Sequence, residues 1–600
     1  MSIAVTTRSY DNTRSGANTQ ETILTPAAIR TRGIQRLFSL ALPGDARGCE
    51  AQPLIVPGVK LADGRTHDVV YVATMANQVF AFDANTGAGL WMVQLGTPIK
   101  GNSSIDSHLI NDHWGILSTP VIDTQAAVMY ACVWTSVDGS PARGQHYLRA
   151  IRLRDGSDAH PPLNLEGVSY DPGQGRPVQQ FRSAERKQRA ALLLLNGTVF
   201  VAFGTIVESA ATARGWLIAV DTATFKISAT WTSTSRGSGG GIWHSGGGPA
   251  ADAEGNIYVV TGNGDFDATT DFGESIVKLR YTPPHPNSAG SLAVVDWWTP
   301  WTDDGRTGGN PNGEAAKQSQ AKAMPTNFRR DMHLARLYGA AAMNMSDSWG
   351  DQDFGAAGPV LAPAIGAVLA SNKDGILYTV NLQNLGKTQP ADLNPVNTAH
   401  NYSKLKAPPI FYTYYPGAQP GPAPTNVTGL NFWGGNCTHH LHGTPVLWES
   451  AAHGLTHFCW GENGNLRAWA LTNTGASTYL ACSAEVASAD SPASAQANGP
   501  HGGMPGGMIS LSANGDQDGV IWASIPYTDA NMGISAGRFL AYDAANFGKY
   551  LDGSGSIPPL WDSQQWNWQF SHNKFNRPVV WNGRVFLPTY DGDVWVLGLA

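Results

Sequence analysis

Seven histidines stand a few residues ahead of apolar segments that open at a proline or a small residue, and this spacing is the first sign of chemistry in the sequence. They are His113, His244, His439, His440, His442, His501 and His572. If the segments behind them line one channel, imidazoles from distant parts of the chain meet there, which suits Cu, Fe or Zn. His244, His442 and His113 are then the first choices as ligands. The alternative is that a histidine in such a channel only hydrogen-bonds a carbonyl.

Motifs of several other chemistries are absent. The sequence has no Gly-x-Ser-x-Gly elbow, no Walker loop and no His-Glu-x-x-His, so serine hydrolase, nucleotide phosphatase and zincin functions have no support. Cys437, followed by Thr-His-His, is either a metal-bound thiolate or the partner of Cys459 in a disulfide across one hairpin.

The amino-acid composition excludes further classes of protein. Only 14% of the residues are charged, while 68 Gly and 37 Pro are typical of short buried strands joined by tight turns. A net charge of -7 gives no basic field for nucleic acid, and no stretch approaches the ~20 apolar residues of a membrane helix. The N-terminus lacks the pattern of a secretory signal, so the compartment is either the cytoplasm or that of a leaderless secreted or periplasmic protein.

The elements that would position the histidines form a repeat. In residues 68–91 two alternating apolar runs are separated by a turn, and a second tight turn at residues 83–87 leads into a third run. Eight inner strands open in the same way, near residues 52, 118, 190, 248, 358, 444, 505 and 577. Sheets that contact only their neighbours tolerate such uneven spacing. The sequence predicts one all-β domain over residues 1–600, an eight-bladed β-propeller.

Closure of the ring is also predictable. Residues 36–40 form an orphan apolar strand before the first blade, and pairing it with the last strand, residues 594–600, would remove exposed sheet edges. Residues 303–351 and 388–434 are expected to be loop insertions over one face. Asp112, Asp351 and Asp353 lie where they could supply an acid or base or orient a ligating ring.

The repeat also resembles that of a known family. Asp-Ala-Asn-Thr-Gly at residues 83–87, followed by Leu90 and Trp91, looks like the tryptophan-docking repeat of pyrroloquinoline quinone (PQQ) dehydrogenases. Weaker matches to this repeat occur at residues 219–221 and 541–543. Other stretches, such as the one that begins at Gly241, are similar to uncharacterised bacterial proteins with PQQ-like repeats, which bring no function with them. The resemblance covers nearly the whole chain and implies the quinoprotein dehydrogenase fold.

In that family PQQ lies on the propeller axis over a Ca²⁺ ion held by a Glu, an Asn and a catalytic Asp. The resemblance implies Glu208 and Asn263 as cofactor-binding residues, and Lys373 as a group aimed at a quinone oxygen. Either Asp271 or Glu274 would stand for the carboxylate that takes the proton of an alcohol. An Asn-Gly turn and an ordinary hairpin are the alternatives at positions 263 and 373. The family's adjacent cysteine pair is absent here.

The expected function is that of an oxidoreductase-like quinoprotein-fold enzyme with a small organic substrate in the axial funnel. Its cofactor is then either PQQ with Ca²⁺ or a His-bound transition metal such as Cu, Fe or Zn. A first alternative is a PQQ-free propeller enzyme that uses such a metal, or acid and base groups alone, for oxidation, cyclisation or elimination. A second is a propeller that binds a partner without chemistry. The oligomeric state stays open.

Overall fold

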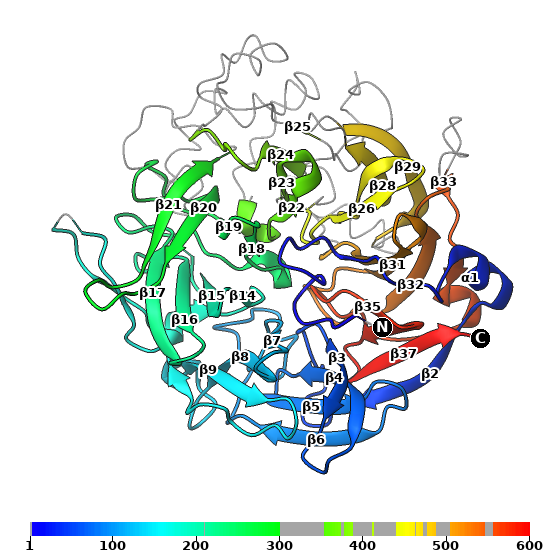
Figure 1. Cartoon of the computed structure of the whole chain (residues 1–600), viewed down its shortest axis with the longest axis horizontal. Helices are drawn as coiled ribbons and strands as arrows, with labels where there is room; N and C mark the ends of the chain where they lie inside the picture. The colour runs from blue at the N-terminus through cyan, green and yellow to red at the C-terminus, as the bar shows by residue number, and fades with distance from the viewer. Residues whose placement is uncertain are drawn as a thin grey trace, which may run out of the picture.

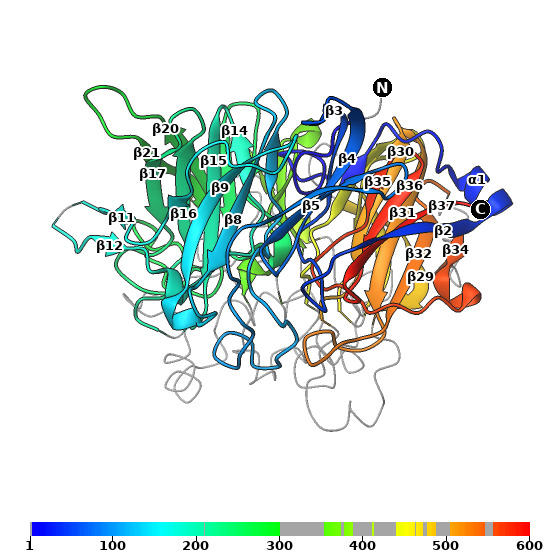
Figure 2. The same cartoon turned by 90° about the horizontal axis from the view of Figure 1, so that it is seen from below.

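Eight β-sheets stand side by side around a central axis (Figure 1), and their strands run between the two faces of the ring (Figure 2). This is a computed structural model that describes residues 3–299 except 174 and 209, 353–387 except 372 and 374–376, 411–412, 440–471 except 463, 477–487, 504–546 and 556–600. The predicted eight-bladed β-propeller is confirmed. In the described part of the chain, no helix has the length and apolar character needed to cross a membrane.

Each of the first four blades has antiparallel strands that follow the chain from the axis outward. Blade 1 contains β3 (Leu54–Lys60), β4 (Thr66–Ala73), β5 (Gln78–Asp83) and β6 (Gly89–Gln94). Blade 2 contains β7 (Val121–Asp123), β8 (Val128–Thr135), β9 (Gln145–Arg152) and β10 (Leu163–Asn164). Blade 3 contains β14 (Leu193–Leu195), β15 (Thr198–Thr205), β16 (Trp216–Asp221) and β17 (Lys226–Thr232), with β13 (Arg186–Lys187) beside β15 and the hairpin β11 (Ser169–Tyr170) and β12 (Gln179–Gln180) before it. Blade 4 contains β18 (Ala250–Ala251), β19 (Asn256–Val260), β20 (Ile276–Thr282) and β21 (Ser291–Trp298).

The other four blades repeat this order. Blade 5 contains β22 (Val360–Ala362), β23 (Ala367–Ser371), β24 (Leu377–Asn381) and β25 (Phe411–Tyr412). Blade 6 contains β26 (Val446–Ser450), β27 (Gly454–Cys459), β28 (Asn465–Leu471) and β29 (Ser477–Val486), and β33 (Ser556–Ile557) extends it. Blade 7 contains β30 (Met508–Asn514), β31 (Gln517–Pro526), β32 (Gly537–Asp543) and β34 (Trp561–Asp562), and β1 (Ala17–Asn18) pairs with β30. Blade 8 contains β35 (Val579–Trp581), β36 (Arg584–Pro588) and β37 (Asp593–Leu599).

An N-terminal strand closes the ring, as the sequence predicts. Strand β2 (Ile34–Ala41) pairs antiparallel with β37 and is the outermost strand of blade 8, with Leu40 opposite Val594. Helix α1 (Pro26–Arg32), capped by the Thr25 hydroxyl, precedes β2, and its Arg30 lies 2.6 Å from Asp543 of blade 7. Because the last blade contains strands from both ends of the sequence, the ring has no open seam.

The blades are held together by apolar faces on both sides of each sheet. In β4, Val70 and Val72 point toward blade 8, where they join the cluster that contains Val579. The alternate residues Val69 and Tyr71 point toward blade 2. Side chains of a strand alternate between the two faces of its sheet, so a strand buried on both faces is apolar throughout.

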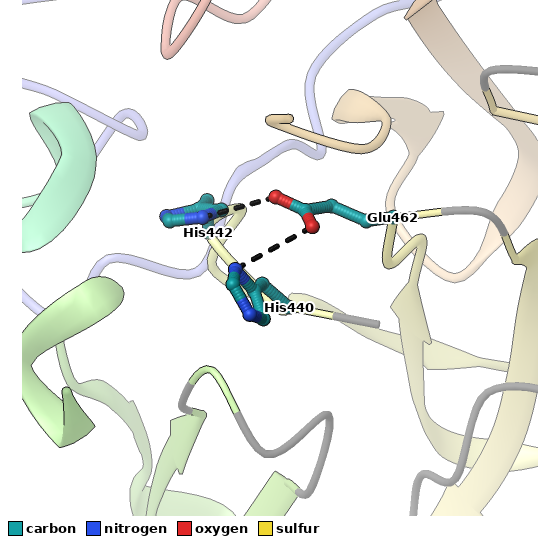
Figure 3. Close-up of side chains that lie close together, drawn as sticks. All are labelled: His440, His442 and Glu462. Atoms are coloured by element: carbon teal, nitrogen blue, oxygen red, sulfur yellow. Dashed lines mark ion pairs between the residues drawn. The ribbon is translucent and has the colours of Figure 1, made fainter. Parts of the chain in front are cut away.

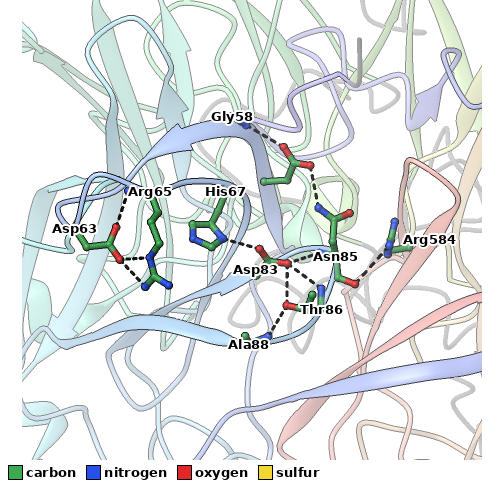
Figure 4. Close-up of polar contacts among 10 residues, drawn as sticks. Gly58, Asp63, Arg65, His67, Asp83, Asn85, Thr86, Ala88 and Arg584 are labelled. Carbon is green, nitrogen blue, oxygen red and sulfur yellow. Dashed lines mark hydrogen bonds and ion pairs between the residues drawn. The ribbon is translucent and has the colours of Figure 1, made fainter.

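The tryptophan of the repeat docks on the next blade. Trp91 of blade 1 donates its indole N–H to the carbonyl of Leu153, 3.1 Å away in the chain that follows β9. Its ring lies against Gly156, where a Cβ would come within 2.9 Å of it. In the turn after β5, the Asp83 carboxylate accepts the backbone N–H groups of Asn85 and Thr86 and lies 2.7 Å from a ring nitrogen of His67 (Figure 4).

A segment that sequence reasoning missed connects all eight blades on the axis. We call residues 5–18 the hub segment; Figure 1 shows it in dark blue near the centre of the ring. Its backbone bonds the inner strands of blades 1, 2, 4, 5, 6 and 7 in order, through Ile55, Ile122, Ala251, Leu361, Leu447 and Leu511. Its side chains reach the other two blades, since Asn12 donates to Leu194 of blade 3 and Asn18 donates to Val580 of blade 8.

The two predicted insertions lie almost wholly outside the described residues. Residues 303–351 are not described, and of residues 388–434 only the short strand β25 is. Their position over one face therefore stays a prediction.

Candidate functional site

A cavity of about 250 Å³ lies where the blades converge on the axis. Its lining comes from blades 3, 4, 5, 7 and 8 and from the segment that precedes blade 2, which only the axis of a ring can bring together. Its aromatic walls include Trp114, Trp243 and Phe575. Its charged lining residues are Asp106, Lys187, Arg189, Glu208, Asp353, Lys373 and Lys574. The hub segment adjoins it, because Arg8 donates to the carbonyl of Phe575 at 2.8 Å.

Two predicted cofactor residues meet beside this cavity. The Asn263 amide donates to the Glu208 carboxylate at 3.5 Å, although the two residues are 55 positions apart. Each lies three residues beyond the second strand of its blade, β15 or β19, and these strands end at the same face of neighbouring blades. Glu208 lines the cavity and Asn263 is buried next to it. A carboxylate and an amide oxygen are ligands that Ca²⁺ accepts.

Lys373, the third predicted cofactor residue, lines the cavity beside Asp353. Its ammonium lies 3.6 Å from the Asp353 carboxylate and 5.3 Å above the centre of the Trp243 ring. The same carboxylate accepts the indole N–H of Trp243 and the backbone N–H of Gly355. Asp353 is thus a buried carboxylate held by three groups at the cavity wall, in a position to exchange a proton with a bound molecule.

The charged groups in and around the cavity shift one another's pKa values. Burial, and then the charges of Arg189 and Lys574, lower the pKa of Lys187 to about 8. Arg189 forms a buried ion pair with Glu50. Burial alone would raise the pKa of Glu50, but Arg189, Lys574 and the hydrogen bonds of Tyr590 and Asn111 outweigh it and lower that pKa. An anionic ligand would therefore be attracted to the cavity, because it would relieve the repulsion between these cations.

The two predicted catalytic carboxylates are not among the cavity-lining residues. Asp271 accepts the backbone N–H groups of residues 235, 236 and 237 at 2.7, 2.9 and 2.7 Å, which binds one loop of blade 4 to the end of blade 3. Glu274 accepts the backbone N–H of Phe354 at 2.9 Å, directly after Asp353 in the chain. It therefore supports the turn that carries Asp353. A catalytic role for either residue stays a prediction.

Three of the predicted metal-binding histidines have other partners. His113 lies 2.7 Å from the Asp45 carboxylate and is partly exposed. The buried ring of His244 lies 2.8 Å from the Val260 carbonyl, and that of His572 lies 3.1 Å from the Ser524 hydroxyl. Burial lowers the pKa of His244 to about 4 and that of His572 to about 3, so both rings are neutral at pH 7. His439 and His501 lie outside the described residues, and so does Cys437. Cys459 carries a free thiol, 3.7 Å from Nδ1 of His457, so the expectation of a disulfide between Cys437 and Cys459 is wrong.

The other two predicted ligands lie together. His440 and His442 share one carboxylate, that of Glu462 (Figure 3), and within the described residues this is the one group of His, Cys, Asp or Glu whose donor atoms come close enough for a metal ion. Glu462 was not among the ligands predicted from the sequence. A positional signal existed, because Glu462 lies three residues beyond β27, the place that Glu208 and Asn263 occupy after β15 and β19.

Comparison with known proteins gives a likeness of structure. No protein-family model matches the chain, and no curated protein matches it. Among solved structures, it is similar to the quinohemoprotein alcohol dehydrogenase of Comamonas testosteroni, with 12% identity, a TM-score of 0.50, and coverage of 99% of this chain and 80% of that one. The chain has the quinoprotein dehydrogenase fold.

Two further solved structures are similar over almost the whole chain. A quinohemoprotein alcohol dehydrogenase of Pseudomonas putida shows 13% identity and a TM-score of 0.49, with coverage of 99% of this chain and 80% of that one. A europium-containing methanol dehydrogenase shows 11% identity and a TM-score of 0.47, with coverage of 99% and 98%. At such identities, function has to be argued from the site.

Proposed function

We propose that the axial cavity is the active site of an oxidoreductase that acts on a small organic alcohol or aldehyde, with PQQ and Ca²⁺ as its cofactors. The observation that carries the proposal is the meeting of Glu208 and Asn263, 3.5 Å apart, beside a cavity that Lys373 also lines. These three residues are the cofactor ligands that the sequence resemblance implies. Their proximity is a property of the side chains, which the shared fold alone does not require.

The residues around the cavity fit this cofactor in charge and in donor chemistry. Four cationic side chains, Lys187, Arg189, Lys373 and Lys574, suit an anionic molecule that carries several carboxylates. The oxygen donors of Glu208 and Asn263 suit a hard cation such as Ca²⁺. A volume of about 250 Å³ is small for a ligand site. A flat cofactor would fill it and leave the substrate at its mouth.

Each residue then has a defined task. Glu208 and Asn263 hold the cation, and Lys373 offers its ammonium to an oxygen of the bound molecule. Asp353 receives the hydroxyl proton of the substrate, in the role that the family resemblance implies for Asp271 or Glu274. The ammonium of Lys373 lies 3.6 Å from this carboxylate. When bound, PQQ supplies a two-electron acceptor for the oxidation.

The test is reconstitution of protein purified without a tag. PQQ binding is followed by quenching of tryptophan fluorescence with and without Ca²⁺, and turnover is followed with an artificial electron acceptor and a panel of small alcohols and aldehydes. We expect Ca²⁺-dependent stoichiometric binding that Glu208→Gln and Asn263→Ala weaken about 10-fold or more. Asp353→Asn should keep binding and lose about 100-fold or more of turnover. Glu254→Gln, at an exposed turn of blade 4, is the matched control.

Failure to bind PQQ at micromolar concentration in the presence of Ca²⁺ would refute the proposal. Binding that Glu208→Gln and Asn263→Ala leave unchanged would refute the assigned site. Turnover without PQQ would favour the PQQ-free enzyme instead.

A further inference from the structure

His440, His442 and Glu462 form a compact group of nitrogen and oxygen donors in blade 6. The Nδ1 atom of His440 lies 3.5 Å from one carboxylate oxygen of Glu462, and the Nε2 atom of His442 lies 3.1 Å from the other. The three donor atoms lie within 4.8 Å of one another. Figure 3 shows both rings on one side of the carboxylate, each facing a different oxygen.

Backbone contacts fix the two segments that carry these donors. The N–H of Glu462 bonds the carbonyl of His440 at 3.0 Å, so the turn after β27 lies against the segment before β26. Gly506 of blade 7 packs on this turn, and a Cβ there would come within 2.9 Å of the Glu462 nitrogen. These contacts hold the two segments close together, which lowers the entropic cost of binding an ion.

A hydroxyl of blade 4 orients the buried imidazole. The Ser245 hydroxyl lies 3.1 Å from Nδ1 of His442, the nitrogen that faces away from Glu462. When Nδ1–H donates to this hydroxyl, the lone pair of Nε2 faces a carboxylate oxygen at 3.1 Å. Two acceptors at that distance need a cation between them, which is either a proton or a metal ion.

We propose that His440, His442 and Glu462 bind one divalent transition-metal ion of the zinc or iron class. With metal–ligand bonds of about 2.1 Å, neighbouring ligand atoms lie about 3.0 to 3.4 Å apart, close to the two donor separations seen here. Two imidazoles and one carboxylate are a set that Zn²⁺ and Fe²⁺ use with further positions open for water. Ca²⁺ prefers oxygen donors, so this site differs in chemistry from that of Glu208 and Asn263.

The proposed ion lies beside the cavity and has a route to solvent. The ring of His442 is 5.8 Å from that of Trp243 and 5.6 Å from that of Phe575, and both of those side chains line the cavity. The side chain of His440 is 21% exposed, which leaves a path for the ion.

The test is metal titration of the full chain, purified without a tag, freed of metal by a chelator and kept without PQQ. We expect one equivalent of Zn²⁺ per chain by calorimetry, a visible absorption band with Co²⁺, and a rise of Tm on addition of Zn²⁺. Anaerobic titration with Fe²⁺ shows which of the two metals binds with the higher affinity. Glu462→Gln and His440→Asn should each weaken Zn²⁺ binding by more than about 100-fold, and Ser245→Ala, which changes only the orienting hydroxyl, by about 10-fold.

His453→Gln is the matched control, because this histidine lies in the first hairpin turn of the same blade, outside the group, and should bind metal like the wild type. Circular dichroism establishes that each variant is folded. If Glu462→Gln does not fold, the partly exposed His440 carries the same test. Less than half an equivalent of bound Zn²⁺ in the wild type would overturn the proposal. So would a Zn²⁺ affinity of Glu462→Gln and His440→Asn equal to that of the wild type. Since no PQQ is present, this outcome is independent of the function proposed above.

Discussion

A histidine buried in blade 2 should make the protein lose stability in mild acid. His146 is 1% exposed, its ring stacks on Trp134 with centroids 5.2 Å apart, and the rings of Phe181 and Phe203 lie at steep angles to it. Neither ring nitrogen has a hydrogen-bond partner among the described residues. Burial, and then the charge of Arg186, lower the pKa of this ring to about 3.

The size of the effect follows from the difference between the folded and the unfolded pKa. The unfolded chain takes up this proton near pH 6.5, whereas the folded ring stays neutral down to about pH 3. Between these values the unfolded state binds more protons, so the free energy of unfolding falls as the pH falls through that window. At pH 5, about 1.5 units below the unfolded pKa, one such ring lowers it by about 2 kcal/mol. The effect vanishes above pH 7.

His146→Phe removes the titrating group and keeps an aromatic ring against Trp134. We expect the wild type to lose about 2 kcal/mol more than this variant when the pH is lowered from 7 to 5, as measured from guanidinium unfolding curves. His285→Gln, in an exposed turn of blade 4, should follow the wild type. Equal pH dependence of the wild type and His146→Phe would refute the reasoning. Burial also lowers the pKa values of His244, His457 and His572, so the wild type should lose more than one ring alone explains.

Three further predictions concern the hub segment, the contact between two blades and the thiols. Arg14→Met should lower the free energy of unfolding by about 3 kcal/mol or more, measured by chemical denaturation, because the guanidinium donates four buried hydrogen bonds of 2.6 to 3.1 Å. Gly519→Ala should lower Tm, because a Cβ there would lie 2.5 Å from the ring of Trp448, and adding Trp448→Leu should recover part of the loss. Cys49 and Cys132 should react with a thiol reagent only after unfolding, since burial raises the pKa of both thiols.

The ring could be predicted from the sequence because its signals are local. A proline or small residue, an alternating apolar run and a tight turn define each inner strand, and all eight predicted starts lie within a few residues of a strand of the structure. The closing strand was predictable because an apolar strand without a neighbour needs a partner. The hub segment carries no such periodic signal, since its bonds are made residue by residue to different blades, and it was missed.

The site was less predictable because the direction of a side chain depends on backbone angles and on tertiary contacts. Glu208 and Asn263 were found through a resemblance in motif, and they meet. The histidines were expected to converge because they precede the inner strands, which line the axis. His244 has a φ of 53° and its ring lies against the Val260 carbonyl, while His442 faces Glu462. Asp353 was identified only as one of several possible acids, because its contact with Lys373 joins separate parts of blade 5.

The hub segment also constrains how this chain assembles and diverges. Its partners extend to Val580, which lies 562 positions beyond Asn18, so its last bonds form only when distant parts of the chain are both present. Until then a nascent ring retains unsatisfied polar groups at its centre, which penalises premature closure with fewer blades. Gain or loss of one blade by duplication or deletion would shift every later contact along the hub segment. A segment of fourteen residues that contacts all eight blades thus matches a ring of this size.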